Sequence, residues 1–107
     1  MPTENPEARR RSSRILWRRP VVVIWAVEGE VKQRAHAETE VVNAHGALLR
    51  LDTPLPSGKQ VELLDPRNNE SEAARVVWSR RVTPTTARAG VELNAPSEKF
   101  WGINTAI

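Results

Sequence analysis

Residues 31–41 read Val-Lys-Gln-Arg-Ala-His-Ala-Glu-Thr-Glu-Val, and their alternation decides the fold class. A period of two residues is typical of an antiparallel strand with one buried face and one solvated face. The stretch therefore predicts such a strand. Its buried face is expected to hold Val31, Ala35, Ala37, Thr39 and Val41 together with Gln33, and its solvated face Lys32, Arg34, His36, Glu38 and Glu40.

Five more segments have strand character, and turn-forming residues separate them. They are residues 21–27, 47–51, 59–64, 73–82 and 87–93. Alternation predicts that Ala74, Val76 and Trp78 share one face of their strand, and that Ala87, Ala89, Val91 and Leu93 face inward. Six short strands with closely spaced turns predict an all-β antiparallel sandwich or barrel over about residues 20–94, and small sheets of this kind tend to close.

The chain has few aromatic residues, so the expected role of each can be considered separately. Ser97 is expected to N-cap a short C-terminal helix, about residues 97–103, whose Phe100 and Trp101 would plug one mouth of the barrel. Core packing is the expected role of Trp25, Trp78 and Trp101. Trp17 lies among arginines before the first long strand, so we expect it to stack on a ligand or contact a partner.

Length and composition set further limits. A chain of 107 residues forms one domain, and without cysteine it has neither disulfides nor thiolate metal sites. The longest apolar run, residues 21–27, is too short to span a bilayer, which needs about 20 residues. It is β-branched and has no small-residue cleavage site, so we do not interpret it as a signal peptide. We expect a cytoplasmic protein.

Positive charge is concentrated at the N-terminus. The chain has 16 Lys+Arg and 13 Asp+Glu, but residues 1–19 alone carry six Arg and two Glu. The rest of the chain is slightly acidic, so a nucleic-acid-binding domain is not expected. Residues 1–8 are predicted to be a disordered, flexible tail. The run at 9–19 offers guanidinium forks, which pair bidentately with phosphate.

A second feature is the Asn43-Ala44-His45-Gly46 turn, which interrupts the β-rich region. Together with the arginine run it indicates a site for a compact, doubly charged phosphate compound. Catalysis is not expected. The chain has two histidines, no Gly-x-Ser-x-Gly nucleophile motif, no Gly-rich phosphate loop with Lys, and no paired carboxylates.

These residues resemble the PilZ domain family over about residues 9–103. Arg10-Arg11-Ser12-Ser13-Arg14 matches its Arg-x-x-x-Arg motif, and Val41-Val42-Asn43-Ala44-His45-Gly46 occupies the place of its Asp/Asn-x-Ser-x-x-Gly motif. Val76-Val77-Trp78, Ala89-Gly90-Val91-Glu92-Leu93 and Phe100-Trp101-Gly102-Ile103 also look like the family.

The resemblance implies a six-stranded barrel that binds cyclic di-GMP, a bacterial second messenger, without a further cofactor. Carried over, Arg10 and Arg14 would grip phosphate and guanine edges, with Arg9 and Arg11 as supplementary contacts. Asn43 and Gly46 would belong to the same site. Arg14 to Arg18 also fits the spacing, so the register stays open. The chain contains no output domain, so a receptor of this kind would pass its signal to an unidentified protein effector.

The second motif departs from the family at two positions. Val41 stands where Asp or Asn would accept hydrogen bonds from guanine, and Asn43 stands where Ser is usual. Two hypotheses follow: a stand-alone cyclic di-GMP receptor, and a PilZ-like interaction module that has lost nucleotide binding. A third hypothesis is a weak nucleic-acid binder that uses the basic tail.

Overall fold

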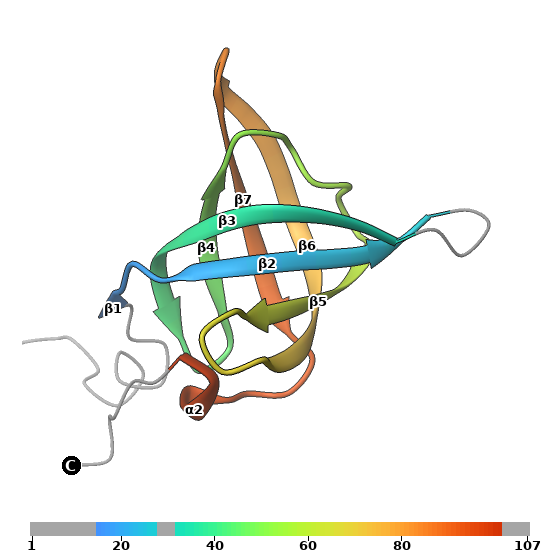
Figure 1. The fold of residues 1–107 in the computed structure, drawn as a ribbon. Coiled ribbons are helices and arrows are strands. Elements are labelled where there is room, and N and C mark those ends of the chain that lie inside the picture. The colour runs from blue at the N-terminus through green and yellow to red at the C-terminus, as the bar shows by residue number, and fades with distance from the viewer. Residues whose placement is uncertain (1–14, 28–31, 102–107) are drawn as a thin grey trace, which may run out of the picture.

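A computed structural model of the chain describes residues 15–27 and 32–101 (Figure 1). The described residues form seven strands, followed by a short helix. The elements are β1 (Ile15–Leu16), β2 (Pro20–Ala26), β3 (Lys32–Asn43), β4 (Gly46–Leu51), β5 (Gln60–Asp65), β6 (Glu70–Thr83), β7 (Thr86–Leu93) and α2 (Glu98–Trp101).

Strands β2 to β7 form a closed antiparallel barrel of six strands. Their order around it is β3-β2-β5-β6-β7-β4, and β4 pairs again with β3 to close the sheet. β1 adds two residues alongside β3, where Ile15 pairs with Val42 and Leu16 with Val41. The predicted fold class is confirmed. The predicted flexible tail of residues 1–8 lies outside the described residues.

The barrel interior is filled by inward-facing aliphatic side chains from every long strand. Val23, Leu49, Leu63 and Val76 are fully buried. The predicted inward face of β7 is confirmed, because the side chains from Ala87 to Leu93 alternate between buried and exposed as expected. Each strand therefore contributes one row to a common core.

A β-bulge in β3 overturns part of the predicted alternation. Thr39 pairs with Leu49 and Val41 pairs with Leu48, so Glu40 is the extra residue. A bulge moves every later side chain to the opposite face. Val42 rather than Val41 consequently enters the core, and Val41 is half-buried on the outer surface. The prediction that Val41 faces inward is therefore wrong.

A second bulge in β6 has the same effect on Trp78. Val76 pairs with Val91 and Trp78 pairs with Gly90, which leaves Val77 as the extra residue. Trp78 is 37% exposed on the outer face. The prediction that it belongs to the core is wrong, because the inserted residue separates it from the inward row of Ala74 and Val76.

Helix α2 is placed as predicted. The Phe100 amide donates to the Ser97 hydroxyl, which is the expected N-cap. Phe100 and Trp101 pack edge to face with ring centroids 4.9 Å apart, and both are buried in the barrel core. The predicted continuation of the helix to residue 103 lies outside the described residues. Trp25 is half-buried against the same core.

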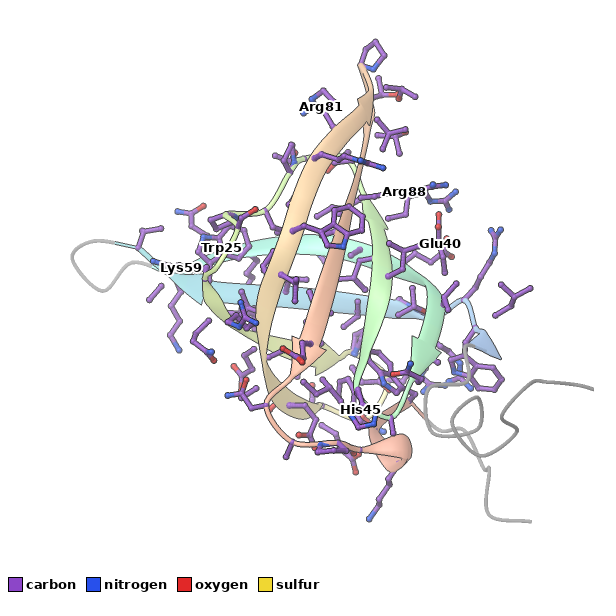
Figure 2. The ribbon with its side chains drawn as sticks, turned by 180° about the vertical axis from the view of Figure 1, so that it is seen from behind. Trp25, Glu40, His45, Lys59, Arg81 and Arg88 are labelled. Atoms are coloured by element: carbon purple, nitrogen blue, oxygen red, sulfur yellow. The ribbon has the colours of Figure 1, made fainter. Side chains whose placement is uncertain are left out.

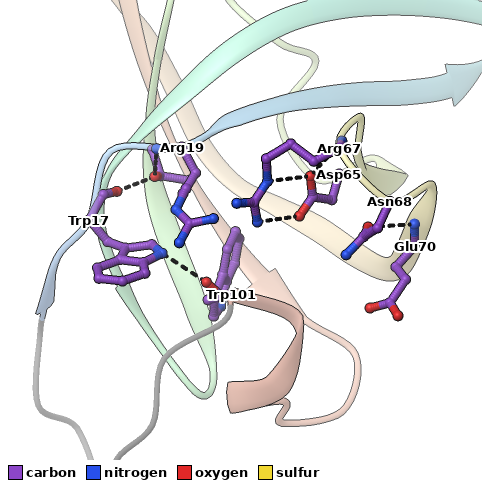
Figure 3. A network of polar contacts seen from close by, with 8 residues as sticks. Trp17, Arg19, Asp65, Arg67, Asn68, Glu70 and Trp101 are labelled. Carbon is purple, nitrogen blue, oxygen red and sulfur yellow. Dashed lines mark hydrogen bonds and ion pairs between the residues drawn. The ribbon is translucent and has the colours of Figure 1, made fainter.

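The linker between β1 and β2 is held at this mouth of the barrel (Figure 3). The Trp17 indole N–H donates to the Trp101 carbonyl over 2.7 Å, and the Arg19 guanidinium lies 4.6 Å from the Trp17 ring centroid. The buried Thr39 hydroxyl accepts from the Arg19 amide and donates to the Trp17 carbonyl. Trp17 thus has a structural contact, half-buried between the barrel and α2.

The two differently placed tryptophans generate a stability prediction. Trp101→Ala should lower the free energy of unfolding by about 3–5 kcal/mol, because it empties a buried aromatic site. Trp78→Ala should cost less than about 1.5 kcal/mol, because the indole is partly solvated. Urea unfolding followed by circular dichroism measures both. Equal costs would contradict the outward placement of Trp78.

Candidate functional site

A cleft of about 460 Å³ lies on the outer surface of the barrel, over β3, β4, β7 and β6. Its floor is a row of side chains at paired positions. Val41 pairs with Leu48, Leu48 with Gly90, and Gly90 with Trp78. Three apolar side chains and a glycine thus cross four neighbouring strands. Such a surface suits a planar or apolar group.

Gly90 makes room for the Trp78 indole. A Cβ added to Gly90 would lie 2.4 Å from the Trp78 Nε1 atom, well inside van der Waals contact. The indole therefore rests directly on the β7 backbone. Its remaining surroundings include the Arg80 guanidinium, whose carbon is 5.4 Å from the ring centroid. One end of the cleft is therefore the Trp78 indole, which can lie against β7 because residue 90 has no side chain.

The Asn43-Ala44-His45-Gly46 turn forms another boundary of the cleft. The Asn43 side-chain oxygen accepts from the backbone N–H groups of His45, over 2.8 Å, and Gly46, over 3.1 Å. This hydrogen bonding is typical of Asn in a turn. It occupies the acceptor atom of the side chain, so the amide N–H groups are what Asn43 can offer to a ligand.

The packing of β4 against β7 explains why residue 46 is glycine. It does not have a positive φ, whereas Gly58 does, at 79°. Nor is a ligand needed to explain it. A Cβ at Gly46 would lie 2.1 Å from the Val91 carbonyl oxygen, so the residue permits the close approach of β4 to β7. Gly46 lines the cleft, and its part in ligand binding stays a prediction.

Charged groups at the two sides of the floor row have partners of opposite sign. Arg75 pairs with Glu92 over 3.2 Å on the side of the Asn43 turn. On the other side Arg88 approaches Glu40 to 3.5 Å, and Arg50 pairs with Glu38. Figure 2 shows this face, with His45 at one end and Arg88 beside Glu40 toward the other.

Strand β1 pairs with the part of β3 that lines this cleft. Leu16 pairs with Val41, which is a floor residue, and Ile15 pairs with Val42. Arg14 is covalently joined to Ile15. The predicted ligand-binding residues Arg9, Arg10, Arg11 and Arg14 lie outside the described residues. Arg18 is described and exposed, whereas Arg19 stacks on Trp17 at the barrel mouth.

Sequence reasoning missed several residues of the cleft. Trp78 was assigned to the core, and Leu48, Gly90, Arg75 and Glu92 were given no role in a site. Gly90 carried a usable signal, because an isolated glycine inside a strand often marks a close approach of another group. The bulges carried none, since two consecutive valines lie at or next to the shift in both strands, Val41-Val42 in β3 and Val76-Val77 in β6.

Comparison with known proteins found no match: no family model, no curated protein and no solved structure resembles the chain significantly. Within residues 15–27 and 32–101, no three side chains of His, Cys, Asp or Glu gather as metal ligands would. The part of the chain that the structure describes also has no helix long and apolar enough to cross a membrane.

The two close-packed glycines generate a second prediction. Gly46→Ala should destabilise the protein by about 1–3 kcal/mol, because its Cβ meets backbone that cannot move alone. Gly90→Ala should cost less than about 1 kcal/mol, because the exposed Trp78 indole can rotate away. Thermal unfolding and tryptophan fluorescence measure both variants. A larger loss for Gly90→Ala, or unchanged fluorescence in it, would contradict this packing.

Proposed function

We propose that this protein is a PilZ-type receptor for cyclic di-GMP that acts as a stand-alone adaptor. The observation that carries the proposal is the pairing of β1 with β3. Leu16 pairs with Val41 and Ile15 with Val42, so the motif that begins at Arg10 is joined to a strand at the edge of the cleft. The two residues that directly follow the first PilZ-like motif thus pair with the strand that carries the start of the second.

The chemistry of the cleft fits this ligand class. Cyclic di-GMP combines two phosphates with two guanine rings. Arg10 and Arg14 supply forks for phosphate and for the acceptor edge of guanine, with Arg9 and Arg11 beside them. The Asn43 amide offers further donors, Gly46 keeps the turn close to β7, and the floor from Val41 to Trp78 is apolar. The volume of about 460 Å³ lies within the usual range for ligand sites.

Val41 supports a second candidate function. Its side chain lies on the outer face at the cleft and has no hydrogen-bonding atom, and the Asn43 oxygen is already occupied by its own turn. Nearby, Leu16 is 83% exposed and Val77 is 47% exposed. The cleft thus has few side-chain hydrogen-bond acceptors and an exposed apolar border. An interaction module that has lost nucleotide binding would present such a surface to a protein partner.

In either case the function is binding rather than catalysis. The receptor would act in the bacterial cytoplasm and signal through a protein effector. The arginine-rich segment is the part whose environment changes when the ligand binds. A nucleic-acid partner is less favoured, because the chain outside residues 1–19 carries slightly more acidic than basic groups.

Calorimetric titration with cyclic di-GMP tests the first function, with GTP and short DNA as controls. We expect saturable binding by the wild type, and a loss of about 10- to 150-fold in Arg10→Ala or Arg14→Ala as charge-assisted hydrogen bonds are removed. Arg34→Ala removes one exposed charge from the far half of β3 and should leave the affinity unchanged.

The same series distinguishes the arginine registers. A loss in Arg18→Ala, without one in Arg10→Ala, would assign the Arg14/Arg18 pair. Full affinity in all three variants would place the site elsewhere. If the wild-type protein shows no binding of cyclic di-GMP at high micromolar concentration, the interaction module is favoured.

Restoring the second motif provides an independent test. Val41→Asp combined with Asn43→Ser should tighten cyclic di-GMP binding by about five- to 150-fold, because an acceptor for the guanine edge returns to the floor of the cleft. The two single variants are the controls, and Val41→Asp should account for most of the gain. An unchanged dissociation constant would mean that this turn does not contact guanine.

A further inference from the structure

Three arginines form a second row across the cleft face, next to the floor. Arg50 pairs with Arg88 across β4 and β7, and Arg88 pairs with Arg80 across β7 and β6. Each lies two residues along its strand from Leu48, Gly90 or Trp78, so all three are on the same outer face as the floor. We call Arg50, Arg88 and Arg80 the arginine row. The row lies on the outer face directly beside the residues that line the cleft.

Taken by itself, the arginine row destabilises the folded sheet. Like charges directly opposite one another on neighbouring strands destabilise a sheet. Glu38 and Glu40 compensate Arg50 and Arg88. Arg80 pairs with no carboxylate among the described residues, and its guanidinium lies near the Trp78 ring. Residues 73–91 contain four Arg and no Asp or Glu. A local conflict of this kind is typical of functional surfaces.

The geometry of the row fits an oxyanion. The Arg80 and Arg88 Cα atoms face each other across an antiparallel pair, about 4.5–5.5 Å apart, so both forks can reach one phosphate. Glu40 uses only part of the donors of Arg88, because a guanidinium has five N–H groups. The row is about 7 Å along the strands from Trp78 and Gly90. A sugar bridges such a span between a ring over the floor and its phosphate.

We propose that Arg80 and Arg88 form a phosphate site at the rim of the cleft, which binds a phosphate of the ligand whose planar group covers Trp78. The identity of that ligand as cyclic di-GMP rests on the proposed function, whereas the affinity of the row for phosphate does not. This site uses residues other than Arg10 and Arg14. It gives the second phosphate of a cyclic dinucleotide a contact on the barrel itself.

The test compares Arg80→Gln, and Arg80→Gln with Arg88→Gln, against Arg34→Gln, which matches the charge change of the single variant. The single variant leaves the Arg88–Glu40 pair intact and so guards against a folding defect. Calorimetry with cyclic di-GMP should show weaker binding by about threefold or more in the single variant and about tenfold or more in the double variant. Arg34→Gln should bind like the wild type.

A second readout is independent of the nucleotide. Inorganic pyrophosphate, added to isotope-labelled wild-type protein, should shift the side-chain Nε–Hε resonances of Arg80 and Arg88 before that of Arg34. Guanosine, which has no phosphate, should not shift them.

The outcomes separate the two claims. Pyrophosphate shifts without any binding of cyclic di-GMP would support the phosphate site and contradict the proposed function. Wild-type affinity for cyclic di-GMP in the double variant, or pyrophosphate shifts at Arg34 equal to those at Arg80, would overturn the phosphate site. Loss of short-DNA binding in the double variant, with cyclic di-GMP affinity unchanged, would identify the row as a polyanion surface instead.

Discussion

The pairing of β3 with three other strands is the constraint on which the structure depends. Its first half pairs with β2, its second half pairs with β4 to close the barrel, and its end also receives β1. A straight β3 could not pair with all three strands, because closing a sheet requires strong twist and bending. The bulge at Glu40 supplies that bend. It also turns Val41 outward and leaves Thr39 buried beneath the linker.

The cleft follows from this bend and from two glycines. Gly46 lets the turn after β3 approach the Val91 carbonyl, and Gly90 lets the Trp78 indole rest on β7. Where glycines replace side chains on the outer face, the surface is hollowed beside the end of β3. The N-terminal segment enters the barrel at that same place, through β1. In the proposed receptor, the ligand is therefore shared between a rigid barrel face and the chain that precedes Ile15.

Sequence periodicity predicted the barrel because most strands alternate strictly between inward and outward side chains. The β7 sequence from Ala87 to Leu93 is a clear case, and Ser97 correctly marked the start of α2. The bulges in β3 and β6 were not predictable. In each, valine stands at adjacent positions, so the pattern remains acceptable whether or not a residue is inserted. Val41 and Trp78 were assigned to the wrong face for this reason.

The candidate site was predictable only in part. The Asn43 turn was found because its residue types punctuate a β-rich region, and the structure places it at the cleft. The floor and the arginine row depend on which residues of four strands face one another. That register is set by barrel closure, which no single segment encodes. Leu48 and Arg88 therefore had no local signal that joined them to Asn43.

In the proposed receptor, the chain beginning at the arginine motif and the outer face of β3, β4, β7 and β6 form one site. Backbone amide and indole resonances, followed by two-dimensional NMR during titration with cyclic di-GMP, test it most directly. If they form one site, the resonances of Leu16, Val41, Gly46 and the Trp78 indole will shift together with a single saturation curve. Shifts confined to β2 and β5, or an unchanged Trp78 indole while the arginine segment responds, would contradict it.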